Sequence, residues 1–285
     1  MSEDIIREID QCFSSDQNSS LRSVSNQVNV SSSVRNVARN ILKLFPYKIQ
    51  TGHQLNERDC ESRINFCSWM LNQINNDEEF LDNCFFSDEA HFYLSGYVNR
   101  QNYRFWAKEN PSVSHRRPLH SAKVTAFVIM SRSLIFGPYW FSGTINQRTY
   151  VDILKDQFYP ECLEKGLDMT KMWWKQDGAT PHASNYALEW LKEKFGEKII
   201  SRRTDHVWPS NSPDLSPLDF YLWGKIKDNV YKTRPQSLTH LQEKIIAEVA
   251  SIEGDELERV FSNFEDRLKQ CIDQKGSYLS NLFVL

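Results

Sequence analysis

The sequence predicts an α/β protein with a mixed sheet flanked by helices, preceded by a small all-α region. Three observations lead to this prediction. Between residues 84 and 141, apolar and aromatic segments alternate with turn-rich stretches, which is typical of successive strands. Beyond residue 141, strand-like segments alternate with segments of helical periodicity, as in a sheet covered by helices. Residues 1–45 carry only short apolar stripes of helical spacing.

The composition indicates a soluble, globular, intracellular protein. The 285 residues are 40% hydrophobic and 25% charged, enough for one large domain and a small one. The net charge of -3 is less basic than that of most nucleic-acid-binding domains, although basic clusters at 35–48 and 108–123 can bind phosphates locally. The 6 Cys form no C-x-x-C pair, so we expect no zinc site. The apolar runs are too short to predict a membrane span.

Residues 1–45 are predicted to form three short helices that resemble a helix-turn-helix unit in outline. The third helix directs Val34, Val37, Ala38, Ile41 and Leu42 inward and exposes Ser32, Arg35, Asn36, Arg39 and Asn40. Arg and Asn side chains suit the edges of guanine and adenine, so these five exposed residues are the predicted DNA contacts. A small helical bundle whose Arg and Asn merely face water explains the pattern equally well.

The remaining chain divides into a linker with a connecting helix, residues 46–80, and a large domain, residues 81–285. The connecting helix is expected over 57–76. Strands are expected at 84–94, 103–107, 123–130, 134–141, 172–176 and 198–202. Further helices are expected at 147–158, 182–195, 217–231 and 237–271. Thr180 is the expected N-cap of the helix over 182–195, with Pro181 at its first position.

Asp88 is the first of three carboxylates that call for an explanation. Side chains alternate along a strand, so Asp88 shares its face with Cys84, Phe86, Ala90 and Phe92. An unpaired carboxylate in such apolar surroundings costs several kcal/mol, so it needs a cation or dense hydrogen bonding. An Asp in a turn at the end of the strand is the alternative.

Asp177 and Asp219 are the other two. Asp177 lies between the strand at 172–176 and a helix, where α/β sheets tend to place catalytic groups, although Asp-Gly is also a common turn dipeptide. Asp219 lies in the first turn of the helix at 217–231, with Ser216 as the expected N-cap, so it can stabilise the helix start as well as bind a metal ion. Asp214 is the rival ligand, although it looks more like a turn residue. Three Asp can hold divalent ions for phosphoryl transfer.

Three segments resemble the signature blocks of the Tc/mariner transposase superfamily: residues 86–92 (FSDEAHF), 176–182 (QDGATPH) and 208–223 (WPSNSPDLSPLDFYLW). The resemblance covers roughly residues 20–285. It implies an RNase H-like catalytic fold and a DDE/D site in which Asp88, Asp177 and Asp219 bind Mg²⁺ or Mn²⁺, with two ions expected. It also implies hydrolysis of a DNA phosphodiester, followed by attack of the freed 3′-hydroxyl on target DNA.

The same resemblance implies double-stranded DNA as the partner, at transposon ends and target, together with a homodimer and a nuclear location that follows from the substrate. His182 is expected to contact a substrate phosphate or to orient the metal shell, and a plain helix-start histidine is the alternative. Family members usually carry two helix-turn-helix units, whereas residues 1–45 have room for about one. We therefore expect a shortened N-terminus. The interval from Asp177 to Asp219 is also longer than in the best-known mariner members.

Two other functions remain open from the sequence. The chain can be a catalytically silent, transposon-derived DNA-binding protein, because an intact triad does not demonstrate turnover. It can also be an RNase H-type hydrolase of RNA–DNA hybrids, because one fold can host several chemistries. The helix-turn-helix candidate favours duplex DNA over a hybrid.

Overall fold

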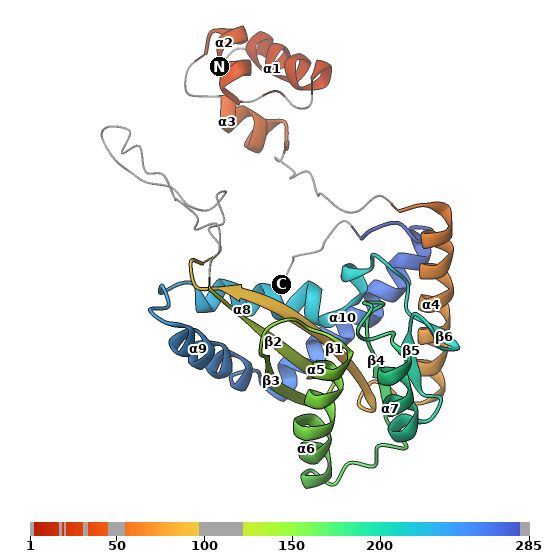
Figure 1. The fold of residues 1–285 in the computed structure, drawn as a ribbon. Helices are drawn as coiled ribbons and strands as arrows, with labels where there is room; N and C mark the ends of the chain where they lie inside the picture. The colour runs from red at the N-terminus through yellow and green to blue at the C-terminus, as the bar shows by residue number, and fades with distance from the viewer. Residues whose placement is uncertain are drawn as a thin grey trace. The chain divides into compact units, whose positions relative to one another are not determined.

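The computed structural model describes residues 3–16, 19, 21–30, 34–44, 55–96 and 122–279. The chain forms two compact units, Met1–Thr51 and Gly52–Leu285 (Figure 1). The strand predicted at 103–107 and the predicted DNA contact Ser32 lie outside the described residues. No helix in the described ranges has the length and apolar character needed to cross a membrane.

The N-terminal unit is helical, as predicted. It contains α1 (Glu3–Ser15), α2 (Leu21–Val28) and α3 (Val34–Asn36), which continues into a π-helical turn, η1 (Val37–Ile41). Ile9, Val24, Val34 and Val37 form its core. Ile41 was expected to face this core but is 50% exposed. The π-helical turn explains this error, because its wider i→i+5 spacing moves Ile41 off the apolar face of a regular α-helix.

The second unit begins with the predicted connecting helix, α4 (Glu57–Asn76). Asn56 caps it in a reciprocal arrangement. The Asn56 side chain accepts a hydrogen bond from the Asp59 N–H, and the Asp59 carboxylate accepts one from the Asn56 N–H. This capping box satisfies two backbone donors that a helix start leaves unpaired. Further along the chain, α10 (Gly254–Asp273) packs against α4.

One mixed sheet forms the centre of the second unit. In the described residues its strand order is β3-β2-β1-β4-β5-β6. The strands are β1 (Cys84–Tyr93), β2 (Lys123–Met130), β3 (Ile135–Phe141), β4 (Trp173–Lys175), β5 (Ile199–Ser201) and β6 (His206–Val207). The pairs β1–β2 and β2–β3 are antiparallel, whereas β4, β5 and β6 continue parallel to β1. The sequence predicted all of these strands except β6, which has only two residues and no periodicity to detect.

Helices cover both faces of this sheet (Figure 1). One face packs against α5 (Gln147–Ile153), the π-helical η2 (Leu154–Phe158), α6 (Tyr159–Glu164) and α7 (Asn185–Phe195). The other packs against α4, the π-helical η4 (Leu218–Leu222), α8 (Trp223–Val230), α9 (Leu238–Ala250) and α10. Successive side chains of β1 point to opposite faces of the sheet and so enter the two cores in turn. Phe85 contacts Phe136 and Phe158 on one face, while Phe86 contacts Phe261 and Phe264 on the other.

Two predicted helix starts are wrong. Helix α7 begins at Asn185, capped by the Ser184 hydroxyl, which accepts a hydrogen bond from the Ala187 N–H at 3.2 Å. The predicted cap at Thr180 fails because residues 180–183 form a turn before the helix. Ser216 does not cap the other helix through its side chain, because that helix opens as the π-helical η4 at Leu218. The helix predicted over 237–271 is two helices, α9 and α10, separated at residues 251–253.

Candidate active site

The parallel pairing of β1 and β4 brings two of the predicted residues together. Cys84 pairs with Trp173 and Phe86 with Lys175, and neighbouring strands lie about 4.8 Å apart. Extending this register by two residues would match Asp88 with Asp177, although β4 itself ends at Lys175. The central position of both strands fixes this relationship, because each strand is paired on both sides.

Asp219 approaches the same place from the helical layer. It lies in η4, which packs on β1. Trp223, four residues further along, donates a hydrogen bond from Nε1 to Oδ2 of Asp88 at 2.7 Å. Asp88, Glu89, Asp219 and Trp223 all line a pocket of about 390 Å³. Two of the three predicted carboxylates therefore line one cavity, whereas Asp177 is not among its lining residues.

The carboxylates of this pocket oppose one another's ionisation. Burial raises the pKa of Asp88 well above its ordinary value, and the neighbouring Asp219 and Glu89 raise it further. Burial likewise raises the pKa values of Asp219 and Glu89. Carboxylates crowded in this way lose repulsion when a cation binds among them. The pocket therefore has the electrostatics of a cation site.

Asp177 behaves differently from the other two. Burial by itself would raise the pKa of Asp177, but hydrogen bonds from His182 and from the Ala179 N–H outweigh burial and lower the pKa to about 2. His182 Nδ1 lies 2.6 Å from Asp177 Oδ1. Asp177 is therefore ionised at neutral pH and held in one orientation. His182 itself is only 2% exposed, a placement better suited to orienting Asp177 than to touching substrate.

Lys175 is a site residue that the sequence analysis missed. It is 2% exposed, and its Nζ lies 3.8 Å from the centre of the Trp208 ring. Burial lowers its pKa, whereas Asp88, Asp219 and Asp177 raise it. Lys175 therefore lies close enough to all three carboxylates to interact with them electrostatically. A lysine on a short strand usually indicates an exposed position, and only the central place of β4 in the sheet signals that this one is buried.

Asp214, the rival ligand, is committed elsewhere. Its carboxylate is fully buried and forms an ion pair with Arg63 on α4, with Arg63 Nη2 2.5 Å from Asp214 Oδ2. Arg63 Nη1 donates to Asp214 Oδ1 at 2.8 Å, and the Leu279 N–H donates to Asp214 Oδ2 at 3.1 Å. Both oxygens are thus occupied by protein donors. This arrangement favours Asp219 over Asp214 as the third carboxylate of the site.

The donor set fits Mg²⁺ or Mn²⁺, since both prefer carboxylate oxygens. Within the described ranges, no group of three or more His, Cys, Asp and Glu side chains is placed so that it could hold a metal ion. Mg²⁺ does not require one, because it keeps several waters and is often bound through one or two carboxylates plus substrate phosphates. Asp88 and Asp219 are the two predicted carboxylates that line one pocket.

The predicted DNA contacts lie in the N-terminal unit. Arg35, Asn36, Arg39 and Asn40 are exposed on α3 and η1, as predicted. Asn40 Nδ2 donates to Asn36 Oδ1 at 2.5 Å, so these two side chains lie on one face of the helix.

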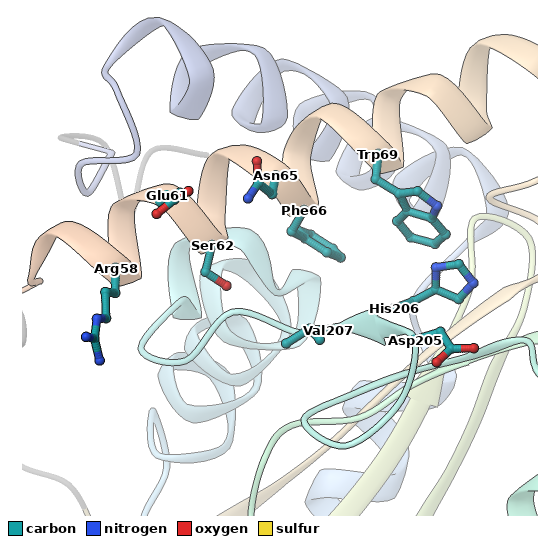
Figure 2. A pocket seen from close by; sticks show the side chains of 9 residues that line it. All are labelled: Arg58, Glu61, Ser62, Asn65, Phe66, Trp69, Asp205, His206 and Val207. Carbon is teal, nitrogen blue, oxygen red and sulfur yellow. The ribbon is translucent and has the colours of Figure 1, made fainter.

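A second pocket of about 500 Å³ lies between α4 and β6 and contains none of the predicted site residues (Figure 2). Trp69 on α4 stacks on His206 of β6, with ring centroids 4.5 Å apart and an interplanar angle of 25°, and both side chains line the pocket. Two carboxylates, Glu61 and Asp205, are also part of its lining. It shares no lining residue with the pocket that Asp88 and Asp219 line.

Comparison with solved structures identifies the fold. The Mos1 mariner paired-end complex with Mn matches 96% of this chain and 79% of its own, at a TM-score of 0.75 and 19% identity. The chain has the fold of a mariner transposase. The catalytic domain of Mos1 transposase with Raltegravir and Mg matches 80% of this chain and 100% of its own, at a TM-score of 0.60 and 19% identity. No protein-family model matches the chain, and no curated protein matches it by sequence.

The Mos1 likeness confirms the predicted architecture. This chain has an RNase H-like mixed sheet flanked by helices, as in the Mos1 catalytic domain, together with N-terminal helices. At 19% identity the likeness to Mos1 is one of fold. One fold can support different activities, so the chemistry must be argued from the side chains of this chain.

Proposed function

We propose that this chain is a metal-dependent DNA transposase, an endonuclease that cleaves DNA phosphodiesters and joins the 3′ end to target DNA. The observation that carries the proposal is the convergence of Asp88 and Asp219 on one pocket, and Asp177 follows β4, the strand next to β1. Residues 81–285 would form the catalytic domain, and residues 46–80 would connect it to a DNA-binding region at 1–45.

Asp88, Asp177 and Asp219 would hold the metal, Mg²⁺ or Mn²⁺, and two such ions activate a nucleophile and stabilise the leaving oxygen of an in-line displacement. The protein's own part is to orient these ligands. Trp223 binds one oxygen of Asp88, and His182 binds one oxygen of Asp177. Lys175 would balance part of the negative charge of these three carboxylates.

The N-terminal unit supports duplex DNA as the substrate. Arg35, Asn36, Arg39 and Asn40 are exposed together on one short helix, and such side chains bind phosphates and base edges. Mos1 has been solved in a paired-end complex with the left transposon end and in a strand transfer complex. We therefore propose transposon ends and target DNA as partners, a homodimer that pairs two ends, and action in the nucleus.

Nicking of supercoiled plasmid DNA in Mn²⁺ tests the proposal. Wild-type protein should nick, and Asp88→Ala and Asp177→Ala should not. Asp205→Ala is the matched control, because Asp205 is exposed and lines a different pocket, so its substitution should leave nicking unchanged. Loss of nicking in all three variants would point to a general defect, and full nicking by Asp88→Ala would refute the assignment.

A catalytically silent DNA-binding protein is the second candidate. The observation that favours it is the absence, among the described side chains, of a preassembled group of three metal ligands. Wild-type protein that binds duplex DNA but fails to nick it in Mn²⁺ would establish this alternative. An RNA–DNA hybrid tested beside duplex DNA separates transposase activity from RNase H-type hydrolysis.

A further inference from the structure

His182 lies buried between two carboxylates that come from different strands. Its Nδ1 is 2.6 Å from Oδ1 of Asp177, which follows β4. Its Nε2 is 3.6 Å from Oε2 of Glu89 on β1. His182 Nε2 and Glu89 Oε2 are both buried, and neither has a hydrogen-bond partner in the described part of the chain. Each is therefore the nearest available partner of the other.

The imidazole ring of His182 is also held from its face and through its backbone. The Tyr150 ring packs on it, with centroids 4.3 Å apart. The Tyr150 hydroxyl donates to Gln176 Oε1 at 2.6 Å, and Gln176 Nε2 donates to the His182 carbonyl at 2.8 Å. Closed networks of this kind fix side chains in a single orientation. The imidazole therefore has little freedom to turn away from Asp177.

The two oxygens of Asp177 are consequently unequal. Oδ1 accepts hydrogen bonds from the Ala179 N–H at 3.0 Å and from His182. No described residue donates a hydrogen bond to Oδ2, although the Asp177 side chain is only 43% exposed. A carboxylate held through one oxygen presents the other in a defined direction. Metal-binding carboxylates are commonly oriented by such outer hydrogen bonds.

We propose that His182 is a positioning residue: it holds Oδ1 of Asp177 so that Oδ2 can bind the divalent ion, and Glu89 anchors the far side of its ring. The inference rests on the proposed function, because it names the residue that sets one metal ligand. Asp88 shows a parallel arrangement, with Oδ2 bound by the ring N–H of Trp223. In both cases a buried ring nitrogen on a neighbouring helix or turn orients the carboxylate.

Replacing His182 by Asn or by Gln separates its contact with Asp177 from its contact with Glu89. In His182→Asn, the side-chain amide lies where Nδ1 was, so it can still donate to Asp177 but cannot reach Glu89. In His182→Gln, the amide lies near the former Nε2, so it can reach Glu89 but not Asp177. Mn²⁺ binding to the full chain is measured by isothermal titration calorimetry, which does not depend on turnover.

We expect His182→Asn to bind Mn²⁺ much as wild type does, and His182→Gln to bind it about 10–100-fold more weakly. Circular dichroism and thermal unfolding establish that each variant is folded. If His182→Gln does not fold, Glu89→Ala serves as the second variant. Because Glu89 also lines the pocket of Asp88 and Asp219, Glu89→Gln is its control: it removes the charge but keeps an oxygen that faces His182. Glu89→Ala should bind Mn²⁺ more weakly than Glu89→Gln does, and equal affinity in the two variants would overturn the proposed anchor. Wild-type affinity in folded His182→Gln would overturn the role of His182.

Asp177→Ala distinguishes failure of this inference from failure of the proposed function. If Mn²⁺ binds wild type but not Asp177→Ala, while His182→Gln retains wild-type affinity, the metal site stands and only the positioning role is lost. If Asp177→Ala binds Mn²⁺ as tightly as wild type does, the metal site assigned to Asp177 is wrong, and the positioning role falls with it.

Discussion

The indole N–H of Trp223 donates a 2.7 Å hydrogen bond to Oδ2 of Asp88. The two residues are 135 positions apart in the chain, and the bond ties the start of α8 to the centre of β1. Trp223 is also 5% exposed and packs against Phe92. The same side chain therefore belongs to the hydrophobic core and to the candidate metal site.

Trp223→Phe should separate these two roles. The phenyl ring retains most of the packing, but Asp88 loses its donor, so the free energy of unfolding should fall by about 1–2 kcal/mol. The Mn²⁺ concentration that supports half-maximal nicking should rise about tenfold or more. Urea unfolding and a Mn²⁺ titration of nicking measure the two effects. Trp190→Phe, on α7, is the control and should leave the Mn²⁺ requirement unchanged.

The stability of the metal-free protein should depend on pH in two opposite ways. The pKa of Asp88 is raised by burial and by Asp219, so the folded state binds its proton more tightly than the unfolded chain does. Stability is then lost as pH rises from the ordinary value of 3.8 through the raised one. Asp88→Asn removes this loss and should stabilise the metal-free protein at pH 7. A lower unfolding midpoint for Asp88→Asn at pH 7 would contradict the expectation.

Asp177 should act at the acidic end. Hydrogen bonds from His182 and Ala179 overcome its burial and lower the pKa from 3.8 to about 2. Its contribution to stability is present above pH 3.8 and is lost as pH falls through about 2. Urea midpoints of wild type and Asp177→Asn, measured from pH 5 to pH 2, should converge toward the acidic end. Curves that stay parallel would argue against the hydrogen-bonded carboxylate.

Asp214→Asn should lower the free energy of unfolding and leave the affinity for Mn²⁺ unchanged. The substitution leaves Arg63 as an uncompensated buried charge, and breaking one partner of such a pair costs about 3–5 kcal/mol. Urea unfolding measures the cost, and calorimetry of the folded variant measures Mn²⁺ binding. Asp219→Asn is the matched comparison: it should weaken Mn²⁺ binding and have little effect on the free energy of unfolding. Loss of Mn²⁺ binding in folded Asp214→Asn would make Asp214 the third ligand.

Arg35→Ala and Arg39→Ala should each weaken binding to duplex DNA and reduce its dependence on salt. Each exposed guanidinium that contacts a phosphate releases about one counterion, so the slope of log affinity against log salt should fall by about 1 per substitution. Fluorescence anisotropy at several salt concentrations gives the slope. Arg7→Ala, exposed on α1, is the control. Equal slopes in all three variants would place the DNA-binding surface elsewhere.

Local patterns were sufficient to predict most of the secondary structure. Alternation along residues 84–93 predicted β1 and the face shared by Asp88 and Phe86, because both depend on the two-residue repeat of a strand. Helix α4 was predicted over its full length. The start of α7 was not, because Thr180 and Ser184 are both good caps, and only the structure shows that Ser184 accepts the hydrogen bond from the Ala187 N–H.

The sequence by itself determined the sheet, the helical layers and the three aspartates worth testing, since these follow from periodicity and from local motifs. Only the tertiary structure decided what each carboxylate contacts. Arg63 reaches Asp214 across 151 residues, and Lys175 is buried because β4 runs through the middle of the sheet. Such pairings arise when distant elements pack together. The energy that selects them is spread over the whole core, so no short stretch of sequence records them.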